Sequence, residues 1–354
     1  MKLKMSYVVA ALLVDTILVL YTLRHYCILD KLFVLPVELI PHYSRSNIAR
    51  HRATDCNLDS GVDFHKKFLY MIMTESCVPE DLLSIDIFGN SLDCQCDLLV
   101  LGYKERCTTA STYSSHVTHI FHPSTTWTTG RGILYNTTVQ GDKKYMYYIF
   151  MDDDAKIKLY NDVQDHNKNP WRSFEDFLFR LRPPIAAIDT EEWRSVDRTI
   201  RFKIRNGCFQ EPMEEYVTAV FFDGMINAFH HRAAETVMEP VLHHWNRFDN
   251  ASWWFSQWYI CLMGDMAYHN QMVFPVEFIT RNTQHRSYPR HFETREIIDL
   301  ITQDIEKIVP IEEFRENNLM QEWRSGGYKD RQSGYSNACV LPHTAGCVHP
   351  YKHI

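Results

Sequence analysis

The sequence feature that most limits the fold is an apolar run that ends in three consecutive carboxylates, YYIFMDDD at residues 147–154. The apolar part of the run predicts a buried strand. Like charges this close together repel one another, so folding alone does not favour three carboxylates at the end of such a strand. A bound divalent cation would favour them.

The spacing of the three carboxylates suits a metal site. Side chains at positions i and i+2 of an extended backbone point the same way, so we expect Asp152 and Asp154 to converge while Asp153 points elsewhere. Mg²⁺ and Mn²⁺ prefer carboxylate oxygens and keep positions open for substrate phosphates. A solvated acidic turn is the alternative. An EF-hand loop is excluded, because its sixth position would be Ile157 instead of Gly and its twelfth Val163 instead of Glu.

Composition limits the class of protein. A chain of 354 residues can hold one large domain or two modest ones, and a hydrophobic content of 45% is ample for a core. The 37 basic and 44 acidic residues give a formal net charge of -7, and Lys and Arg form only short clusters. We therefore expect no nucleic-acid partner.

The amino terminus predicts a membrane anchor. An apolar segment after Lys2 and Lys4 is just long enough to span a thin bilayer, and we place a transmembrane helix at residues 6–23. Asp15 costs about 3 kcal/mol near the centre of such a helix, and the Val, Leu and Ile residues around it offset that cost. A cleaved signal peptide is the alternative, although no small-residue cleavage pattern follows the segment.

Sequons and cysteines favour a lumenal or extracellular body. Sequons begin at Asn136 and Asn250, and the chain has ten cysteines. These features predict a type II protein of the Golgi or ER membrane, with residues 1–5 in the cytoplasm. Cys27 lies next to the anchor, and the other nine cysteines are an odd number. At least one more thiol is therefore unpaired or pairs between chains in a disulfide-linked dimer. Two groups could form bridges: Cys94, Cys96 and Cys107 near one strand, and Cys339 with Cys347 in the tail.

The order of predicted elements indicates an α/β fold, with a Rossmann-like mixed sheet flanked by helices. We expect a stem at residues 24–67, a catalytic domain at 68–310 and a tail at 311–354. Strands are expected at 97–103, 145–151, 185–188, 217–222 and 273–279, and helices at about 124–134, 170–181, 230–244 and 294–308.

Four segments, in order, resemble the motifs of a glycosyltransferase family. WTTGRGILY (127–135), YMYYIFMDDD (145–154), FFDGMINAFHHRAAE (221–235) and SWWFSQW (252–258) are similar to those of an uncharacterised eukaryotic family. Its plant members carry a tryptophan-rich helix, a YxYIFxWDED strand, a motif ending in FSRAAW and a later GWGLD. The pattern also resembles GT-A glycosyltransferases, whose DxD motif follows a buried strand. The resemblance covers about residues 95–290 and implies a GT-A-like fold.

The resemblance implies roles for five residues. Asp152 and Asp154 would bind Mn²⁺ or Mg²⁺, and Asp152 and Asp153 would contact a nucleotide-sugar donor, expected to be UDP-linked. Arg131 would pair with the donor diphosphate, for which a guanidinium fork is well shaped. Its alternative is an ordinary arginine on a helix surface. His285 would add a metal ligand, although the chain has 18 histidines and chance placement is the rival explanation.

The later motif lacks the carboxylate that would serve as the acceptor-activating base. SWWFSQW puts Ser256 or Gln257 where the plant pattern has Asp. Asp223 and Asp249 are therefore our candidate catalytic bases. Asp223 ends a predicted strand beside Gly224, which suits a loop that meets substrate.

Two further groups have structural alternatives. Trp253 and Trp254 could stack on a sugar or pack in the core. The pairs His230-His231 and His243-His244 are expected on a helix surface and at its end.

The sequence thus predicts a metal-dependent glycosyltransferase that moves a sugar from a nucleotide sugar to a glycan, protein or lipid acceptor. One alternative is a membrane-tethered carbohydrate-binding or interaction protein that kept the fold and lost the activity. The other is a phosphatase or phosphotransferase with a DxDx(T/V) nucleophile motif. Lys156 at the fifth position of that motif counts against it.

Overall fold

The computed structural model describes residues 59, 61–160, 168–191, 215–219, 221–242, 254–268, 271–282, 296, 299–301, 303–304 and 307. The predicted anchor, most of the stem and the tail lie outside these residues. No helix in the described part of the chain is long and apolar enough to cross a membrane.

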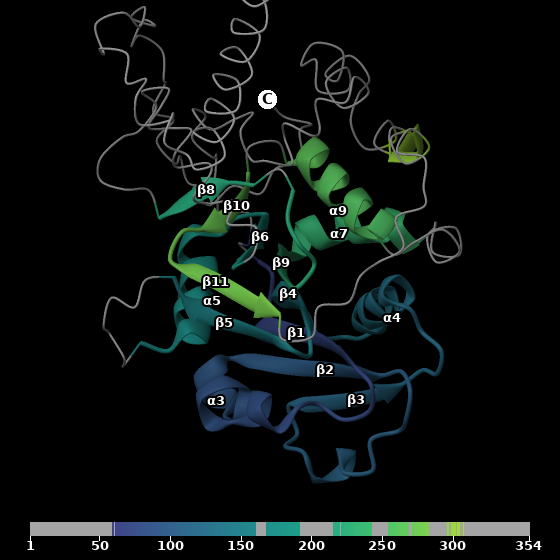
Figure 1. Cartoon of the computed structure of the whole chain (residues 1–354), viewed down its shortest axis with the longest axis vertical. Helices are drawn as coiled ribbons and strands as arrows, with labels where there is room; N and C mark the ends of the chain where they lie inside the picture. The colour runs from purple at the N-terminus through teal and green to yellow at the C-terminus, as the bar shows by residue number, and fades with distance from the viewer. Residues whose placement is uncertain are drawn as a thin grey trace, which may run out of the picture. The chain divides into compact units, whose positions relative to one another are not determined.

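A mixed sheet of eight strands forms the centre of the body (Figure 1). Its strands are β1 (Lys66–Thr74), β2 (Cys96–Gly102), β3 (Val117–Phe121), β4 (Tyr145–Asp152), β6 (Ile185–Ala187), β8 (Tyr216–Thr218), β9 (Ile226–His230) and β10 (Met272–Pro275). Their spatial order is β3-β2-β1-β4-β9-β6-β10-β8. The first four strands are parallel, β9 is antiparallel to its neighbours β4 and β6, and β8 is antiparallel to β10.

A smaller sheet and several helices complete the body. The smaller sheet has the order β5-β11-β7, with β5 (Ala155–Leu159), β7 (Asp189–Thr190) and β11 (Phe278–Asn282). The helices are α3 (Ser91–Cys94), α4 (Trp127–Val139), α5 (Pro170–Leu181), α7 (His231–Leu242) and α9 (Trp254–Ala267). Short turns of helix lie at η2 (Glu80–Leu83), η3 (Ile85–Gly89) and η4 (Ala110–Thr112).

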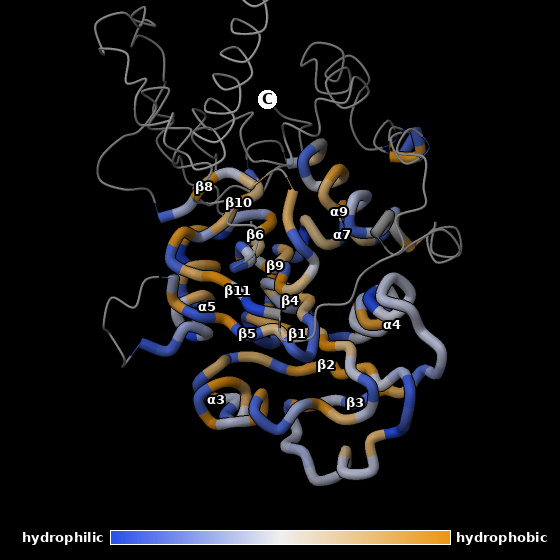
Figure 2. The backbone as a smooth tube through the Cα atoms, viewed as in Figure 1, coloured by the Kyte–Doolittle hydropathy of each residue, from blue (hydrophilic) through white to orange (hydrophobic). Residues whose placement is uncertain are grey.

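The large sheet is covered on both faces. Leu69 and Met71 of β1 belong to the core layer that includes α4, α7 and α9, whereas Phe68 and Tyr70 belong to the layer that includes α5. Figure 1 shows these two groups of helices on opposite sides of the sheet. Burial on both faces explains why β2 and β4 read as unbroken apolar runs, and β2 is largely hydrophobic in Figure 2.

The predicted mixed α/β architecture is confirmed, and its large mixed sheet fits the expected GT-A-like arrangement. Helix α5 matches its prediction because its signals are local: the Asn169 side chain accepts hydrogen bonds from two backbone amides of the first turn, and Pro170 opens the helix. Helix α4 begins later than expected. Thr126 caps it in a capping box with Thr129, whereas Ser124 has a left-handed φ of 59°.

Several boundaries differ from the predictions. Residues 226–230 form a strand that was not predicted, and α7 begins at His231, one residue after the predicted start. A buried apolar run of this length does not distinguish strand from helix by its pattern. The predicted strand at 273–279 is two strands, because the chain turns at residues 276–277. Strand β1 begins at Lys66, inside the predicted stem.

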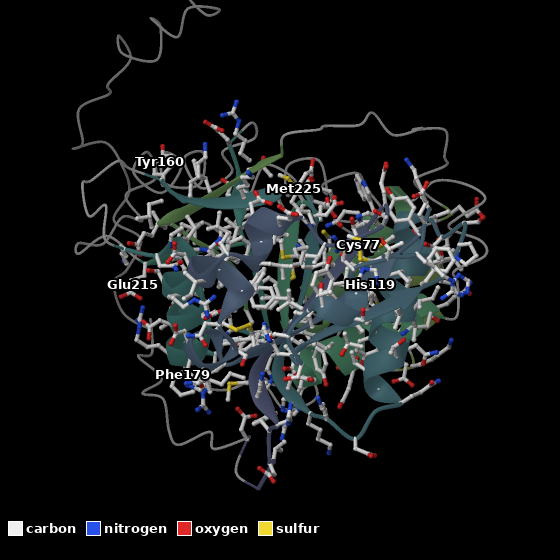
Figure 3. The ribbon with its side chains drawn as sticks, turned by 90° about the horizontal axis from the view of Figure 1, so that it is seen from below. Cys77, His119, Tyr160, Phe179, Glu215 and Met225 are labelled. Atoms are coloured by element: carbon white, nitrogen blue, oxygen red, sulfur yellow. A yellow bond between two sulfur atoms is a disulfide. The ribbon has the colours of Figure 1, made fainter. Side chains whose placement is uncertain are left out.

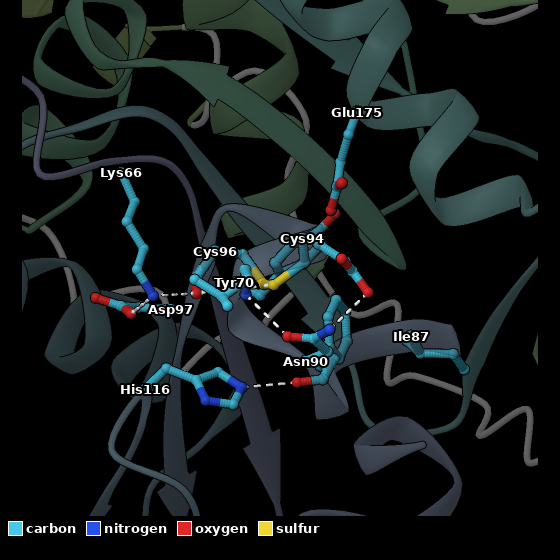
Figure 4. Close-up of a disulfide and its surroundings, with 12 residues drawn as sticks. Lys66, Tyr70, Ile87, Asn90, Cys94, Cys96, Asp97, His116 and Glu175 are labelled. Atoms are coloured by element: carbon cyan, nitrogen blue, oxygen red, sulfur yellow. Dashed lines mark hydrogen bonds and ion pairs between the residues drawn. A yellow bond between two sulfur atoms is a disulfide. The ribbon is translucent and has the colours of Figure 1, made fainter. Parts of the chain in front are cut away.

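Two disulfides lie in the first half of the body. Cys94 pairs with Cys96, as Figure 4 shows, and Cys107 pairs with Cys77 instead of with either of them. Cys261 is free and buried. The Cys77–Cys107 bridge joins the segments that follow β1 and β2, and Figure 3 shows Cys77 close to His119 of β3. The remaining cysteines, including those proposed to pair in the tail, lie outside the described residues.

Candidate active site

The acidic triplet lies where the order of the strands reverses. Asp152 is the last residue of β4, and its register partner in the neighbouring β1 is Met73. The chain runs outward from β1 to β2 and β3, and then returns through α4 to place β4 on the other side of β1. In open α/β sheets, ligands bind in the crevice at the carboxyl ends of the strands at such a switch point.

The triplet also joins the two sheets. Asp153 and Asp154 form a turn between β4 of the large sheet and β5 of the small one. We expected an extended backbone to align Asp152 with Asp154. The backbone is not extended there, because the strand ends at Asp152. The two carboxylates are nevertheless close enough for the charge of Asp154 to raise the pKa of Asp152.

Asp152 is a carboxylate under electrostatic stress. Burial raises its pKa to about 7, the Arg131 guanidinium opposes that rise, and the charges of Asp223 and Asp154 add to it. The side chain of Trp127 donates a hydrogen bond to Asp152, which also favours the charged form. The side chain of Asp152 remains 24% exposed. A positive ion beside it would relieve the repulsion among the three carboxylates.

Asp223 reaches this group from the segment before β9. The backbone amide of Asp152 donates to the carbonyl of Met225 at 3.0 Å. The amide of Met225 in turn donates to Asp223 Oδ1 at 3.0 Å. Asn227 Nδ2 donates to the carbonyl of Asp223 at 2.6 Å. These bonds hold the segment against the end of β4, so the predicted candidate base and the acidic triplet lie in one site.

Arg131 holds the same segment from the side of α4. The residue is 3% exposed, so the alternative of a surface arginine is wrong. Its Nη1 donates to Asn227 Oδ1 at 3.3 Å, and its Nη2 donates to the carbonyl of Gly224 and lies 3.4 Å from Asp152 Oδ1. The guanidinium also stacks 3.9 Å above the ring of Trp127. Protein acceptors thus engage this guanidinium, and its contact with a diphosphate stays a prediction.

Gly224 allows α4 and α9 to meet at the site. A Cβ atom on this residue would lie 2.5 Å from Trp127 Cζ2 and 2.8 Å from Gln257 Oε1. Both distances are shorter than van der Waals contacts allow, so a side chain here would require the side chains of Trp127 and Gln257 to move. Trp127 and Asn227 are contributors that were not predicted as site residues from the sequence. The signal for Asn227 is a polar residue inside an apolar run, and it is fully buried.

The residues in the place of the plant carboxylate are buried in the interior. Ser256 is 1% exposed, and its Oγ lies 2.5 Å from Thr128 Oγ1. Gln257 is 5% exposed, and its Nε2 donates to the carbonyl of Phe222 at 2.5 Å. Gln257 Oε1 has no hydrogen-bond partner among the residues that the structure describes. Neither side chain replaces a base, which leaves Asp223 as the described candidate.

Several other predicted site residues lie elsewhere. Asp249, His285 and Trp253 lie outside the described residues, as does the pair His243-His244, so their roles stay predictions. The expectation that His230 lies on a helix surface is wrong: it ends β9 and is 1% exposed, because the strand continues to this residue.

The donor set fits a hard divalent cation that also binds substrate. In the described part of the chain, Asp152, Asp154 and Asp223 do not bring three ligand atoms within 4.8 Å of one another. Mg²⁺ is commonly held by only one or two carboxylates, with substrate phosphates and water completing the shell. A pair of carboxylates at a switch point, where phosphates bind, meets that requirement.

Comparison with known proteins found likeness only among solved structures. No protein-family model and no curated protein matches the sequence. A mannosyltransferase from Pyrobaculum calidifontis, in complex with GDP-Man and Mn²⁺, is 11% identical with a TM-score of 0.38, over 78% of this chain and 74% of that one. Mouse xyloside xylosyltransferase 1, in its apo form, is 13% identical with a TM-score of 0.24, over 52% of this chain and 74% of that one. Both similar structures are glycosyltransferases, and at these scores the likeness does not decide the fold or the activity of this chain.

Proposed function

We propose that the chain is a metal-dependent glycosyltransferase that moves a sugar from a nucleotide-sugar donor to a glycan, protein or lipid acceptor. The observation that carries the proposal is the meeting of Asp152, Asp154 and Asp223 at the switch point of the sheet, where the last two raise the pKa of the first. Repulsion of this kind costs stability unless a ligand compensates for it. A cation that bridges the carboxylates and a diphosphate would do so.

Asp152 and Asp154 are the proposed protein ligands of Mn²⁺ or Mg²⁺. When bound, the cation would neutralise charge on the diphosphate of the leaving nucleotide. Asp153, in the same turn, is a proposed contact for the donor. The structure does not identify the nucleobase of the donor, and a UDP-linked sugar remains our expectation.

Asp223 is the proposed base that accepts the proton of the acceptor hydroxyl. The Met225 amide fixes one of its carboxylate oxygens. Arg131 acts through its contacts with the Gly224 carbonyl, Asn227 and Asp152, and is therefore a positioning residue. Holding a base and a donor site in one fixed geometry is worth several kcal/mol of activation free energy in enzymes, about 7 or more in favourable cases.

We also propose that the body lies in the lumen of the Golgi or ER behind an amino-terminal anchor. The Cys77–Cys107 and Cys94–Cys96 disulfides support an oxidising compartment. Asn136, the first residue of one sequon, is exposed on α4 and could carry a glycan there. Endoglycosidase treatment of the protein from secretory cells, followed by a gel-mobility assay, tests this location.

Thermal unfolding of the full chain with nucleotide sugars tests the class of enzyme. A donor at 100 times its Kd should add about 2.7 kcal/mol to the free energy of unfolding, and we expect this gain only with Mn²⁺ or Mg²⁺ present. UDP-linked and GDP-linked sugars form the panel. Asp152→Asn and Asp154→Asn should each remove the gain, and Asp142→Asn, at an exposed position after α4, should keep it.

Release of the nucleotide in the presence of acceptor distinguishes a transferase from a binding protein that has lost its activity. Metal-dependent stabilisation with nucleotide release supports the transferase. Stabilisation without release for every acceptor supports the alternative of a binding protein that has lost its activity. If no nucleotide sugar stabilises the chain with either metal, the donor site is not at Asp152 and the proposal fails.

A further inference from the structure

A second cluster of polar side chains lies at the opposite ends of the strands β4 and β9 of the large sheet. His230 ends β9, and its register partner is Tyr147, near the start of β4. Asp152 lies at the other end of that strand. Tyr147 and Asp152 are five positions apart on the strand at about 3.3 Å per position, so the two clusters are roughly 17 Å apart. Nothing in the proposed transfer reaction uses this second cluster.

We propose that Asp59, His230 and His231 form a binding site for a transition-metal ion, with Zn²⁺ as the best fit. One ligand atom from each of the three residues lies within 4.8 Å of the other two. His231 Nε2 lies 3.3 Å from Asp59 Oδ1, and His230 Nε2 lies 3.4 Å from both oxygens of that carboxylate.

These distances match the spacing of metal ligands better than that of direct hydrogen bonds. Charge-assisted contacts between a nitrogen and a carboxylate are shorter, at about 2.7–2.9 Å. In a tetrahedral zinc site with bonds of about 2.0–2.1 Å, neighbouring ligand atoms are roughly 3.3–3.4 Å apart. Each histidine nitrogen therefore lies from the Asp59 carboxylate at the distance expected for two ligands of one zinc ion.

The change from strand to helix allows two adjacent histidines to reach one carboxylate. Neighbouring side chains of a strand point to opposite faces. His230 is the last residue of β9 and His231 is the first of α7, so the backbone changes course between them. Their ring centres are 4.5 Å apart. The side chains of His230, His231 and Asp59 are 1%, 15% and 10% exposed, so the site is shielded from bulk water.

Arg182 orients the carboxylate from its far side. Its Nη1 lies 3.3 Å from Asp59 Oδ2, which leaves Oδ1, the oxygen nearest His231, directed at the proposed ion. Partners of this kind outside the ligand shell commonly hold a ligand in place. Arg182 follows α5 with a left-handed φ of 47°, an uncommon conformation for a residue other than glycine.

The ligand types select a different metal from that of the first site. Imidazole nitrogens suit Zn²⁺, Cu²⁺ and Ni²⁺, whereas sites with carboxylates alone suit Mg²⁺ and Mn²⁺. Three protein ligands leave a fourth tetrahedral position for water or another group. The two sites of this chain should therefore load independently.

Zinc binding by the full chain tests the proposal without reference to activity. We expect one high-affinity Zn²⁺ per chain in competition with a chromophoric chelator, and visible absorption bands when Co²⁺ replaces it. Asp59→Asn and His231→Gln should each weaken binding by about 100-fold or more, since even loss of a residue behind the ligands costs 10–100-fold. The double variant His243→Gln/His244→Gln, which changes the other adjacent pair, should bind as the wild type does.

A ligand exchange keeps the test decisive if these variants fold poorly. His231→Cys replaces one zinc ligand with another, so it should retain Zn²⁺ and add a thiolate-to-cobalt charge-transfer band to the Co²⁺ spectrum. Asp152→Asn should leave Zn²⁺ affinity unchanged, which separates this site from the proposed donor site. Wild-type zinc affinity in His231→Gln, or a His231→Cys protein without the new band, would overturn the proposal.

Discussion

The two polar clusters of this molecule, at opposite ends of β4 and β9, shift the pKa of their aspartates in opposite directions. At the carboxyl end of β4, burial and two further carboxylates raise the pKa of Asp152 to about 7. At the other end of these strands, the neighbouring His230 and His231 lower the pKa of Asp59 to about 2, although burial opposes them. Neighbouring carboxylates thus raise the pKa of the aspartate in the first cluster, whereas imidazole nitrogens lower it in the second.

The contrast indicates which ligand each cluster could accept. An excess of carboxylate oxygen favours a hard cation with phosphate, whereas two imidazoles around one carboxylate favour zinc. A raised pKa alone does not identify a functional site. Glu175 on α5 also has a pKa raised to about 8, chiefly by burial, yet it pairs with Tyr70 of the packed core (Figure 4) and with Arg172 of its own helix.

The largest effect is expected from removing a ligand of the first cluster. Asp154→Ala should lower sugar transfer by about 100-fold to 1,000-fold, or roughly 2.7–4 kcal/mol in activation free energy, because charge on the leaving diphosphate would lose its counterion. Steady-state kinetics at saturating Mn²⁺ measure the loss. Asp142→Asn is the surface control, and an Asp154→Ala protein with wild-type turnover would contradict the proposed role.

Arg131→Met should cost about 3 kcal/mol in the free energy of unfolding. It removes the guanidinium that lies 3.4 Å from Asp152 Oδ1 and leaves the carbonyl of Gly224 without this donor. Urea unfolding measures the loss. Arg106→Gln, at an exposed arginine over the ring of Phe121, should change stability by less than about 0.5 kcal/mol. Equal stability of the two variants would show that the guanidinium does not hold the first cluster together.

Gly224→Ala should cost about 1–3 kcal/mol, because its Cβ would collide with Trp127 and with Gln257. The matched control is Gly141→Ala, whose Cβ would meet the carbonyl of Thr138 at an ordinary 3.4 Å. Thermal unfolding compares the two variants. We also expect Gly224→Ala to weaken donor binding while the zinc affinity of the second cluster stays unchanged. Loss of both would mean that the clusters are not independent.

A pH dependence at Glu175 calibrates the comparison of raised pKa values. Its folded-state pKa of about 8 lies above the ordinary 4.5. Its stabilising contribution is therefore fully present below pH 4.5 and is lost as the pH rises through about 8. The free energy of unfolding of the wild type should fall relative to Glu175→Gln over that range. Glu239→Gln, at an exposed glutamate of α7, is the control, and a flat difference for Glu175→Gln would show that the carboxyl is already charged when folded.

Features that depend on neighbouring residues were predictable. Strand β4 and its acidic end follow from one apolar run and three charges, and α5 follows from Asn169, Pro170 and helical spacing. Strand β9 was not predicted, because an apolar run buried on both faces fits a strand or a helix equally well. Only its pairing with β4 and β6 fixes it as a strand.

The local sequence nominated Asp152 and Asp154 as metal ligands, because adjacent carboxylates at the end of an apolar strand favour a bound cation. Asp223 was nominated as a base through the resemblance to the plant motifs, where the expected carboxylate is missing. The meeting of these residues in one site required pairing between β4 and β9, which are more than seventy residues apart in the chain. The second cluster depended on folding entirely, since Asp59 falls in the predicted stem and lies 171 positions from His230. Long-range strand pairing is set by the burial of whole faces, and a local pattern contains no information about which distant residues share an edge.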